Sequence, residues 1–111
     1  MIKISVEPGE EIISKVSKII EEKNIKEGSL VSIIGAVDEC CISTMSKEDA
    51  KKDILSEYHE PLELSGTGEI HEGVPHIHVV LGRERNKAIF GHLRWGRVKS
   101  WFVHVYVLFY T

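Results

Sequence analysis

The sequence has no excess of positive charge. Its 111 residues include 14 lysines and arginines against 17 aspartates and glutamates, so the formal net charge is −3 with histidine neutral. Proteins that bind nucleic acid or an anionic membrane surface broadly through charge need a basic excess. The composition therefore argues against both functions, although it leaves room for a local basic patch in the C-terminal half.

Cysteine is scarce as well, and the only two cysteines, Cys40 and Cys41, are neighbours. Adjacent strand residues point to opposite faces, which makes a disulfide between them unfavourable. The pair also lacks the C-x-x-C spacing of a zinc or redox site. We expect two reduced, partly buried thiols in a cytoplasmic protein.

Long apolar runs are missing too. Polar residues interrupt every apolar stretch well short of the roughly 20 residues that span a membrane, and no signal-peptide core follows Met1. The G-x-x-x-x-G-K-[ST] phosphate loop and the G-x-S-x-G nucleophile elbow are absent. We therefore expect a cytoplasmic protein without membrane association, and the length favours a single domain over residues 1–111.

The apolar pattern predicts an α+β fold: a mixed, mostly antiparallel sheet with one long and one short flanking helix. Residues 10–23 have apolar side chains at helical spacing, and the spacing of Ser46 and Asp49 resembles a capping box, which predicts a short helix or helical turn over 47–55. Strands are predicted over residues 1–6, 30–34, 37–45, 76–81, 87–93 and 98–110, and extended structure interrupted by Pro61 is predicted over 57–70.

Glycines add detail to this prediction. Gly35 either separates two strands or bends one, Gly66 and Gly68 indicate a bulge or a close backbone approach, and Gly96 marks a turn. The predicted final strand, 98–110, is substantially apolar on both faces. Such a strand must be covered on both sides, so we expect part of it to pack against another subunit; the alternative is a closed barrel.

The most informative feature is a pair of histidines in the run Pro75-His76-Ile77-His78-Val79-Val80-Leu81. Strand side chains alternate, so His76 and His78 point the same way with Cα atoms roughly 6.5–7 Å apart. A charged turn over 82–87 predicts a hairpin whose return strand brings His92 to the same place. Three imidazoles suit zinc or a similar divalent transition metal and leave a fourth position open.

A less specific interpretation is that these imidazoles are merely hydrogen-bonded at a half-buried face. Of the remaining histidines, His59 and His71 are expected at the surface, with a minor chance that His71 approaches the metal. His104 is expected to be an interior or interface residue more often than a ligand. Glu69 and His104 are the candidates for a general base, if the site is catalytic.

Several segments together resemble the plant- and prokaryote-conserved (PPC) domain family over nearly the whole length. They are Glu7-Pro8-Gly9-Glu10, Ser32-Ile33-Ile34-Gly35-Ala36, Leu64-Ser65-Gly66-Thr67-Gly68-Glu69-Ile70, Pro75-His76-Ile77-His78-Val79 and Gly91-His92-Leu93. The resemblance implies a mixed sheet with flanking helices and a homotrimer. It also implies a metal held by the histidines matching His76, His78 and His92, as in some stand-alone members.

In plants this domain accompanies AT-hook segments that bind DNA, but Arg94-Trp95-Gly96-Arg97 lacks the flanks of an AT-hook. His104 also stands where the family commonly has glutamate, and could either disturb the site or offer a fourth nitrogen. We therefore expect a homotrimeric metal-binding domain that binds a small molecule or partner. The alternatives are a DNA-associated regulator, by family analogy alone, and a zinc-dependent hydrolytic enzyme.

Overall fold

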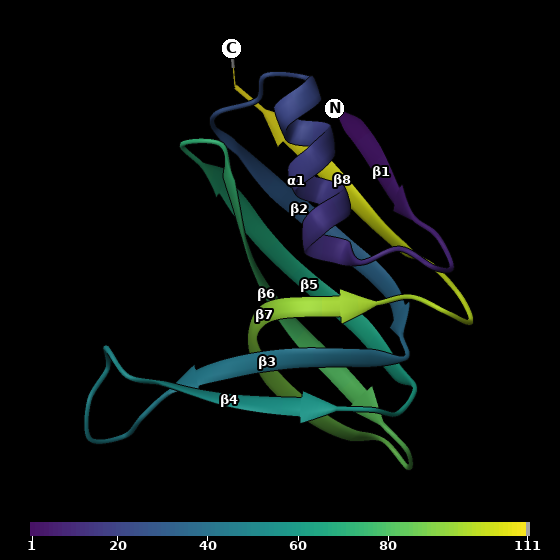
Figure 1. Ribbon diagram of the computed structural model, residues 1–111, viewed down its shortest axis with the longest axis vertical. Coiled ribbons are helices and arrows are strands. Elements are labelled where there is room, and N and C mark those ends of the chain that lie inside the picture. The colour runs from purple at the N-terminus through teal and green to yellow at the C-terminus, as the bar shows by residue number, and fades with distance from the viewer. Residues whose placement is uncertain (111) are drawn as a thin grey trace.

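The computed structural model describes residues 1–110, and one eight-stranded sheet dominates it, with a helix against one face (Figure 1). The elements are β1 (Ile2–Val6), α1 (Ile12–Glu22), β2 (Gly28–Val37), β3 (Glu39–Met45), β4 (Asp53–Tyr58), β5 (Leu62–His71), β6 (Val74–Arg83), β7 (Lys87–Arg97) and β8 (Val103–Phe109). The strand order is β1-β8-β2-β5-β6-β7-β3-β4, and all the pairings are antiparallel.

The predicted short helix over 47–55 is wrong, so the α+β fold has one flanking helix rather than two among the described residues. The segment between Met45 and Asp53 is instead the turn of the β3–β4 hairpin, which projects from the rest of the sheet (Figure 1). The Ser46 N–H donates to the carbonyl of Lys52 at 2.9 Å, and the Ser46 hydroxyl accepts from the Glu48 N–H at 3.2 Å. Local turn bonds thus replace the capping box.

Several predicted boundaries also shift. The break between the second and third strands lies at Asp38, not at Gly35, which is inside β2. Gly96 lies within β7 rather than in a turn; a Cβ there would be 3.1 Å from Cδ1 of Ile12, so the glycine makes room for the helix. The final strand begins only at Val103, because Val98 exchanges backbone hydrogen bonds with Gly9 and Glu10.

The helix contributes one apolar stripe to the core. Ile12, Val16 and Ile20 are fully buried against the sheet, at the spacing that the sequence predicted. Burial of each such side chain contributes roughly 1.5–3 kcal/mol relative to exposure. Glu11 caps the helix, because its carboxylate accepts from the backbone N–H groups of residues 13 and 14. The oxygen that accepts from residue 13 also accepts from the N–H of Gly96 at 2.8 Å, which ties the helix to β7.

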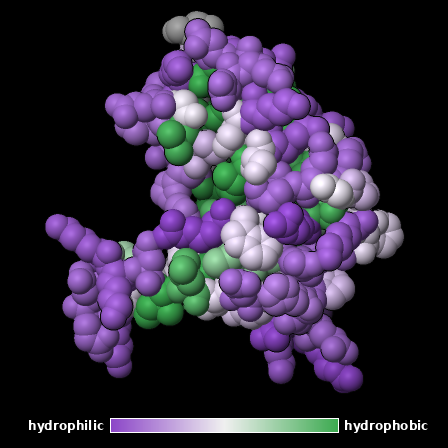
Figure 2. All heavy atoms as spheres, in the orientation of Figure 1, coloured by the Kyte–Doolittle hydropathy of each residue, from purple (hydrophilic) through white to green (hydrophobic). Residues whose placement is uncertain are grey.

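The opposite face of the sheet carries exposed apolar side chains. In β8, Val103, Val105 and Val107 are buried toward the helix, whereas Leu108 remains exposed on the other side. Further apolar side chains exposed at the surface are Ile34, Val80, Phe90 and Phe102. Figure 2, which views the helix side, shows additional hydrophobic surface on the projecting β3–β4 hairpin, where Met45, Ile54 and Leu55 are exposed.

No helix of residues 1–110 is long and apolar enough to cross a membrane.

Candidate metal centre

The structure brings His76, His78 and His92 together on the sheet face opposite the helix. Along β6 the buried Ile77 and Val79 alternate with the exposed histidines. The β6–β7 hairpin pairs His78 directly with His92 across the strands. The predicted hairpin is therefore confirmed, and its register places all three imidazoles in one cluster.

The three rings lie in contact distance of one another. Ring centroids are 4.8 Å apart for His76 and His78, 4.7 Å for His76 and His92, and 5.8 Å for His78 and His92. One nitrogen from each ring lies within 4.8 Å of the others. Nitrogens around tetrahedral zinc with 2.0–2.1 Å bonds are about 3.4 Å apart. Small rotations of the exposed His76 and His78 rings cover this difference, so the donor set fits such an ion.

Two glycines allow β5 to lie close to the histidine-bearing strand. A Cβ on Gly68 would lie 2.2 Å from the backbone oxygen of His76, and one on Gly66 would lie 2.5 Å from that of His78. No side chain fits at such distances, so the close approach predicted for this segment is confirmed. The glycines thereby help to position the backbone of both β6 histidines.

His92 is the least exposed of the three histidines. Burial lowers the pKa of its imidazole, and the neighbouring His76 and Arg94 lower that pKa further. The neutral imidazole is the form that ligates a metal. The environment of His92 therefore favours its ligating form.

The triad lines a hollow of about 380 Å³ together with residues from the projecting hairpin. The other lining residues are Ser43, Thr44, Met45, Asp53, Phe90 and Arg94. Sequence reasoning missed Arg94 and Asp53 as site residues. Strand alternation could have found Arg94, which is two residues beyond His92 on β7. Asp53 could not be found, because its segment was predicted to be helical.

The two candidate general bases have different positions. Glu69 is the cross-strand partner of His76 and lines a neighbouring hollow with His76 and His78. His104 lies on β8, separated from β6 by β2 and β5, and stacks on Phe102 at a centroid distance of 4.3 Å. Within one chain His104 does not join the triad, so it is not a fourth ligand there.

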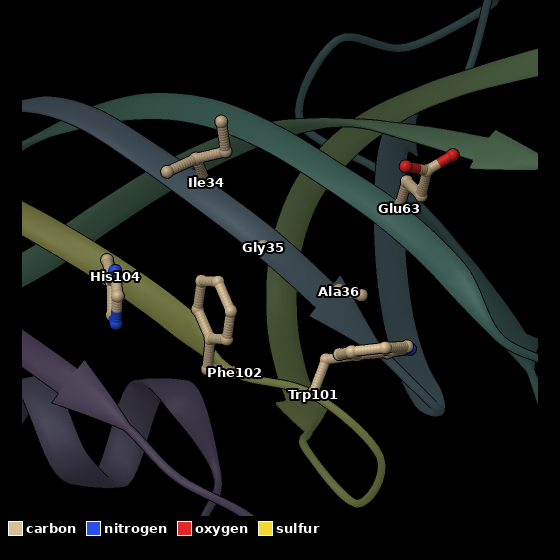
Figure 3. Close-up of a pocket in the computed structure, with 7 residues that line it drawn as sticks. All are labelled: Ile34, Gly35, Ala36, Glu63, Trp101, Phe102 and His104. Carbon is tan, nitrogen blue, oxygen red and sulfur yellow. The ribbon is translucent and has the colours of Figure 1, made fainter.

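His104 belongs instead to a second hollow, which Figure 3 shows in close-up. This hollow has a volume of about 590 Å³ and an apolar wall. Phe102 lies beside His104, Trp101 extends from the loop before β8, and Glu63 projects from β5 (Figure 3). Trp101, predicted within the final strand, is therefore a loop residue and is 68% exposed.

Both cysteines are free, and both are buried more completely than the partial burial that was predicted. Burial raises the pKa of the Cys40 thiol to about 11, and the pKa of the Cys41 thiol is raised for the same reason. Because the thiolate is the reactive form, neither cysteine has the environment of a nucleophile or a metal ligand.

His59 and His71 are exposed, as predicted, and both contact glutamates rather than the triad. His59 lies 3.3 Å from Glu57 and 3.5 Å from Glu39. His71 lies 3.0 Å from Glu27, near the turn between β5 and β6. Neither histidine belongs to the metal-competent cluster.

The pKa of His71 is expected to lie above the ordinary histidine value, because Glu27 accepts from its ring and Glu72 adds negative charge nearby. A raised pKa means that the pair stabilises the fold below the ordinary pKa and loses this contribution as the pH rises through the raised value. An NMR titration of the ring protons measures this. Glu27→Gln should lower the His71 midpoint more than Glu72→Gln does; equal midpoints in wild type and Glu27→Gln would contradict the contact.

An antiparallel sheet with one covering helix and three clustered histidines on its open face defines a small α+β domain with a candidate metal centre. The model of the Plants and Prokaryotes Conserved (PCC) domain matches residues 1–110, and the chain belongs to this family, here called PPC. The predicted resemblance is therefore confirmed over the described length.

Solved structures share this fold. A metal-containing protein from Archaeoglobus fulgidus is 28% identical, with a TM-score of 0.81 over 97% of this chain and 78% of its own. A candidate DNA-binding protein from Bacteroides thetaiotaomicron is 26% identical, with a TM-score of 0.84 over 98% of this chain and 78% of its own. A PPC protein from Pyrococcus horikoshii is 23% identical, with a TM-score of 0.82 over 99% and 78%, and shows the fold alone. None of the curated proteins matches this chain.

Proposed function

We propose that this protein is a metal-binding PPC domain in which His76, His78 and His92 hold one divalent transition-metal ion. The observation that carries the proposal is the convergence of three imidazole nitrogens within 4.8 Å on one sheet face. The metal-containing Archaeoglobus fulgidus protein, which is similar in fold and sequence, supports it. Zinc is the ion we propose, because the donor set consists of imidazoles without thiolate.

The proposed site would bind a small ligand or partner in a cytoplasmic homotrimer. Three protein ligands leave one coordination position of zinc for an exogenous group, as in catalytic and ligand-binding sites rather than structural ones. Assembly is supported by exposed apolar side chains of the sheet face opposite the helix that lie outside the triad hollow, among them Ile34 and Leu108. The resemblance to PPC domains, which implies a trimer, supports it further.

A hydrolytic role is a second candidate, supported by Glu69. Zinc lowers the pKa of a bound water to about 7, and hydrolysis then needs a nearby group to move protons. Glu69 is the carboxylate opposite His76 in the β5–β6 ladder. Glu69, however, does not line the larger hollow that contains His92 and Arg94, so we favour ligand binding over catalysis.

DNA association rests on the candidate DNA-binding protein of similar fold. The charges of this chain support it poorly. Arg83 pairs with Glu60 and Lys99 with Glu39, so these cations are already neutralised by carboxylates. Protein cations bind a phosphate backbone by displacing the counterions condensed on it, and the net charge of −3 opposes such binding.

Elemental analysis combined with native mass spectrometry tests the proposal. Protein purified without chelator and dialysed against zinc should carry one ion per chain and have the mass of three chains. EDTA should remove the ion because exogenous ligands can reach the exposed His76 and His78. Absence of stoichiometric metal after zinc dialysis would overturn the metal site, whereas a monomeric mass at micromolar concentration would overturn only the trimer.

A further inference from the structure

Arg94 is placed to act on whatever binds beside the triad. It follows His92 by two residues on β7 and lines the same hollow. Its Nε donates to the Ser43 hydroxyl at 3.0 Å, and its Nη2 donates to Oδ2 of Asp53. These contacts hold the guanidinium in place from β3 and β4. A guanidinium has five N–H donors, so a fixed Arg94 retains donors for a bound anion.

We propose that this hollow binds a small monocarboxylate, whose charge is shared between the metal ion and the Arg94 guanidinium. The inference rests on the proposed metal site and names the class of its ligand. Phe90 and Met45, which line the hollow and are 54% and 66% exposed, provide apolar surface for the carbon part of the ligand. Guanidinium and carboxylate match in planar geometry and form strong charge-assisted hydrogen bonds.

The hollow offers an anion a single cationic side chain beside the proposed ion. Arg94 is partly offset by the neighbouring Asp53, and the three ligating imidazoles are neutral. Arg94 is the only arginine or lysine among the lining residues, and the apolar side chains beside it offer no further donors. A phosphate dianion gains most from several cationic donors, so a carboxylate suits these residues better.

The ion pair of Asp53 with Arg94 allows a specific test of the inference. Its carboxylate is 50% exposed and accepts from Arg94, so it competes with an incoming carboxylate for the same guanidinium and repels it by charge. Asp53→Asn removes the negative charge and frees a donor, while Arg94→Gln removes the cation. The two variants should therefore change anion affinity in opposite directions. If the ion pair were purely structural, both variants would weaken anion binding to the same extent.

Benzoate binding to the zinc-loaded protein tests the inference by isothermal titration calorimetry at constant ionic strength. Benzamide is the neutral probe of similar shape, and inorganic phosphate is the alternative anion. Arg94→Gln should weaken benzoate binding about tenfold to a hundredfold, the range expected for a hydrogen bond to a charged group. Asp53→Asn should tighten it severalfold. Arg85→Gln, in the β6–β7 turn outside this hollow, is the matched control and should change nothing.

Zinc content and circular dichroism, measured for every variant, separate the possible failures. If wild type holds no zinc, the proposed metal site itself fails. If zinc is held and Arg94→Gln binds benzoate as wild type does, or if both ion-pair variants weaken it alike, the inference fails and the metal site stands. Benzamide binding as tightly as benzoate, or phosphate binding more tightly, would overturn the carboxylate assignment.

Discussion

Gly35→Ala is expected to destabilise the protein by about 3–5 kcal/mol, a large part of the 5–15 kcal/mol typical of a domain. Gly35 lies in β2 between β5 and β8, with a positive φ of 153° that L side chains rarely adopt. An added Cβ would lie 1.9 Å from the Phe102 carbonyl oxygen, which is backbone and cannot rotate away. Backbone strain costs about 1–3 kcal/mol, and forced displacement of the neighbouring strand costs a similar amount.

The free energy of unfolding, measured by urea denaturation, checks this prediction. Gly82→Ala is the matched control, because Gly82 is also a strand glycine but an added Cβ would approach nothing closer than 3.7 Å. That variant should be neutral or slightly more stable, since alanine restricts the unfolded chain. Equal stability of the two variants would show that the Phe102–Val103 backbone does not approach Gly35 this closely in solution.

His92→Ala is expected to reduce zinc affinity at least a hundredfold. His92 is the only one of the three histidines on β7, and its loss leaves two nitrogens on β6. Changes in residues that merely support metal ligands already cost 10- to 100-fold, so removal of a ligand should exceed that range. Competition with a chromophoric zinc chelator measures the dissociation constant at fixed pH.

His104→Ala is the matched control for this measurement. His104 is a partly buried histidine on the same sheet, but it stacks on Phe102 outside the triad. Its replacement should leave zinc affinity unchanged, because His104 neither belongs to the triad nor supports one of its histidines. If His104→Ala instead loses zinc as His92→Ala does, a second copy of the chain would have to supply that nitrogen.

The parts of the fold that could be predicted from the sequence are those that local hydrophobic periodicity indicates. Helix α1 follows from apolar residues at 3.6-residue spacing, and the face of β6 follows from alternation through His76, Ile77 and His78. The His92 position was predictable because a hairpin turn fixes the register of its two strands. These signals act within a few residues, so no knowledge of the rest of the sheet was needed.

The unpredicted parts depend on pairing between distant segments. The residues of β4 have no strong alternation and lie beside a charged turn, so only their pairing with β3 makes them a strand. The extent of β7 past Gly96 likewise depends on β3 and on the helix. The Arg94–Asp53 contact joins β7 to β4, and it depends on the pairing of both strands with β3. The ion pair beside the predicted metal site was therefore missed.

The strand order has a consequence for synthesis on the ribosome. β1 pairs only with β8, and β2 pairs with β8 on one side and β5 on the other. The first strand therefore has no partner until the last one emerges, and the apolar stripe of the helix stays uncovered for most of translation. Non-local pairing of this kind folds slowly and exposes aggregation-prone surface. Nascent chains stalled before Val103 should consequently be clients of chaperones.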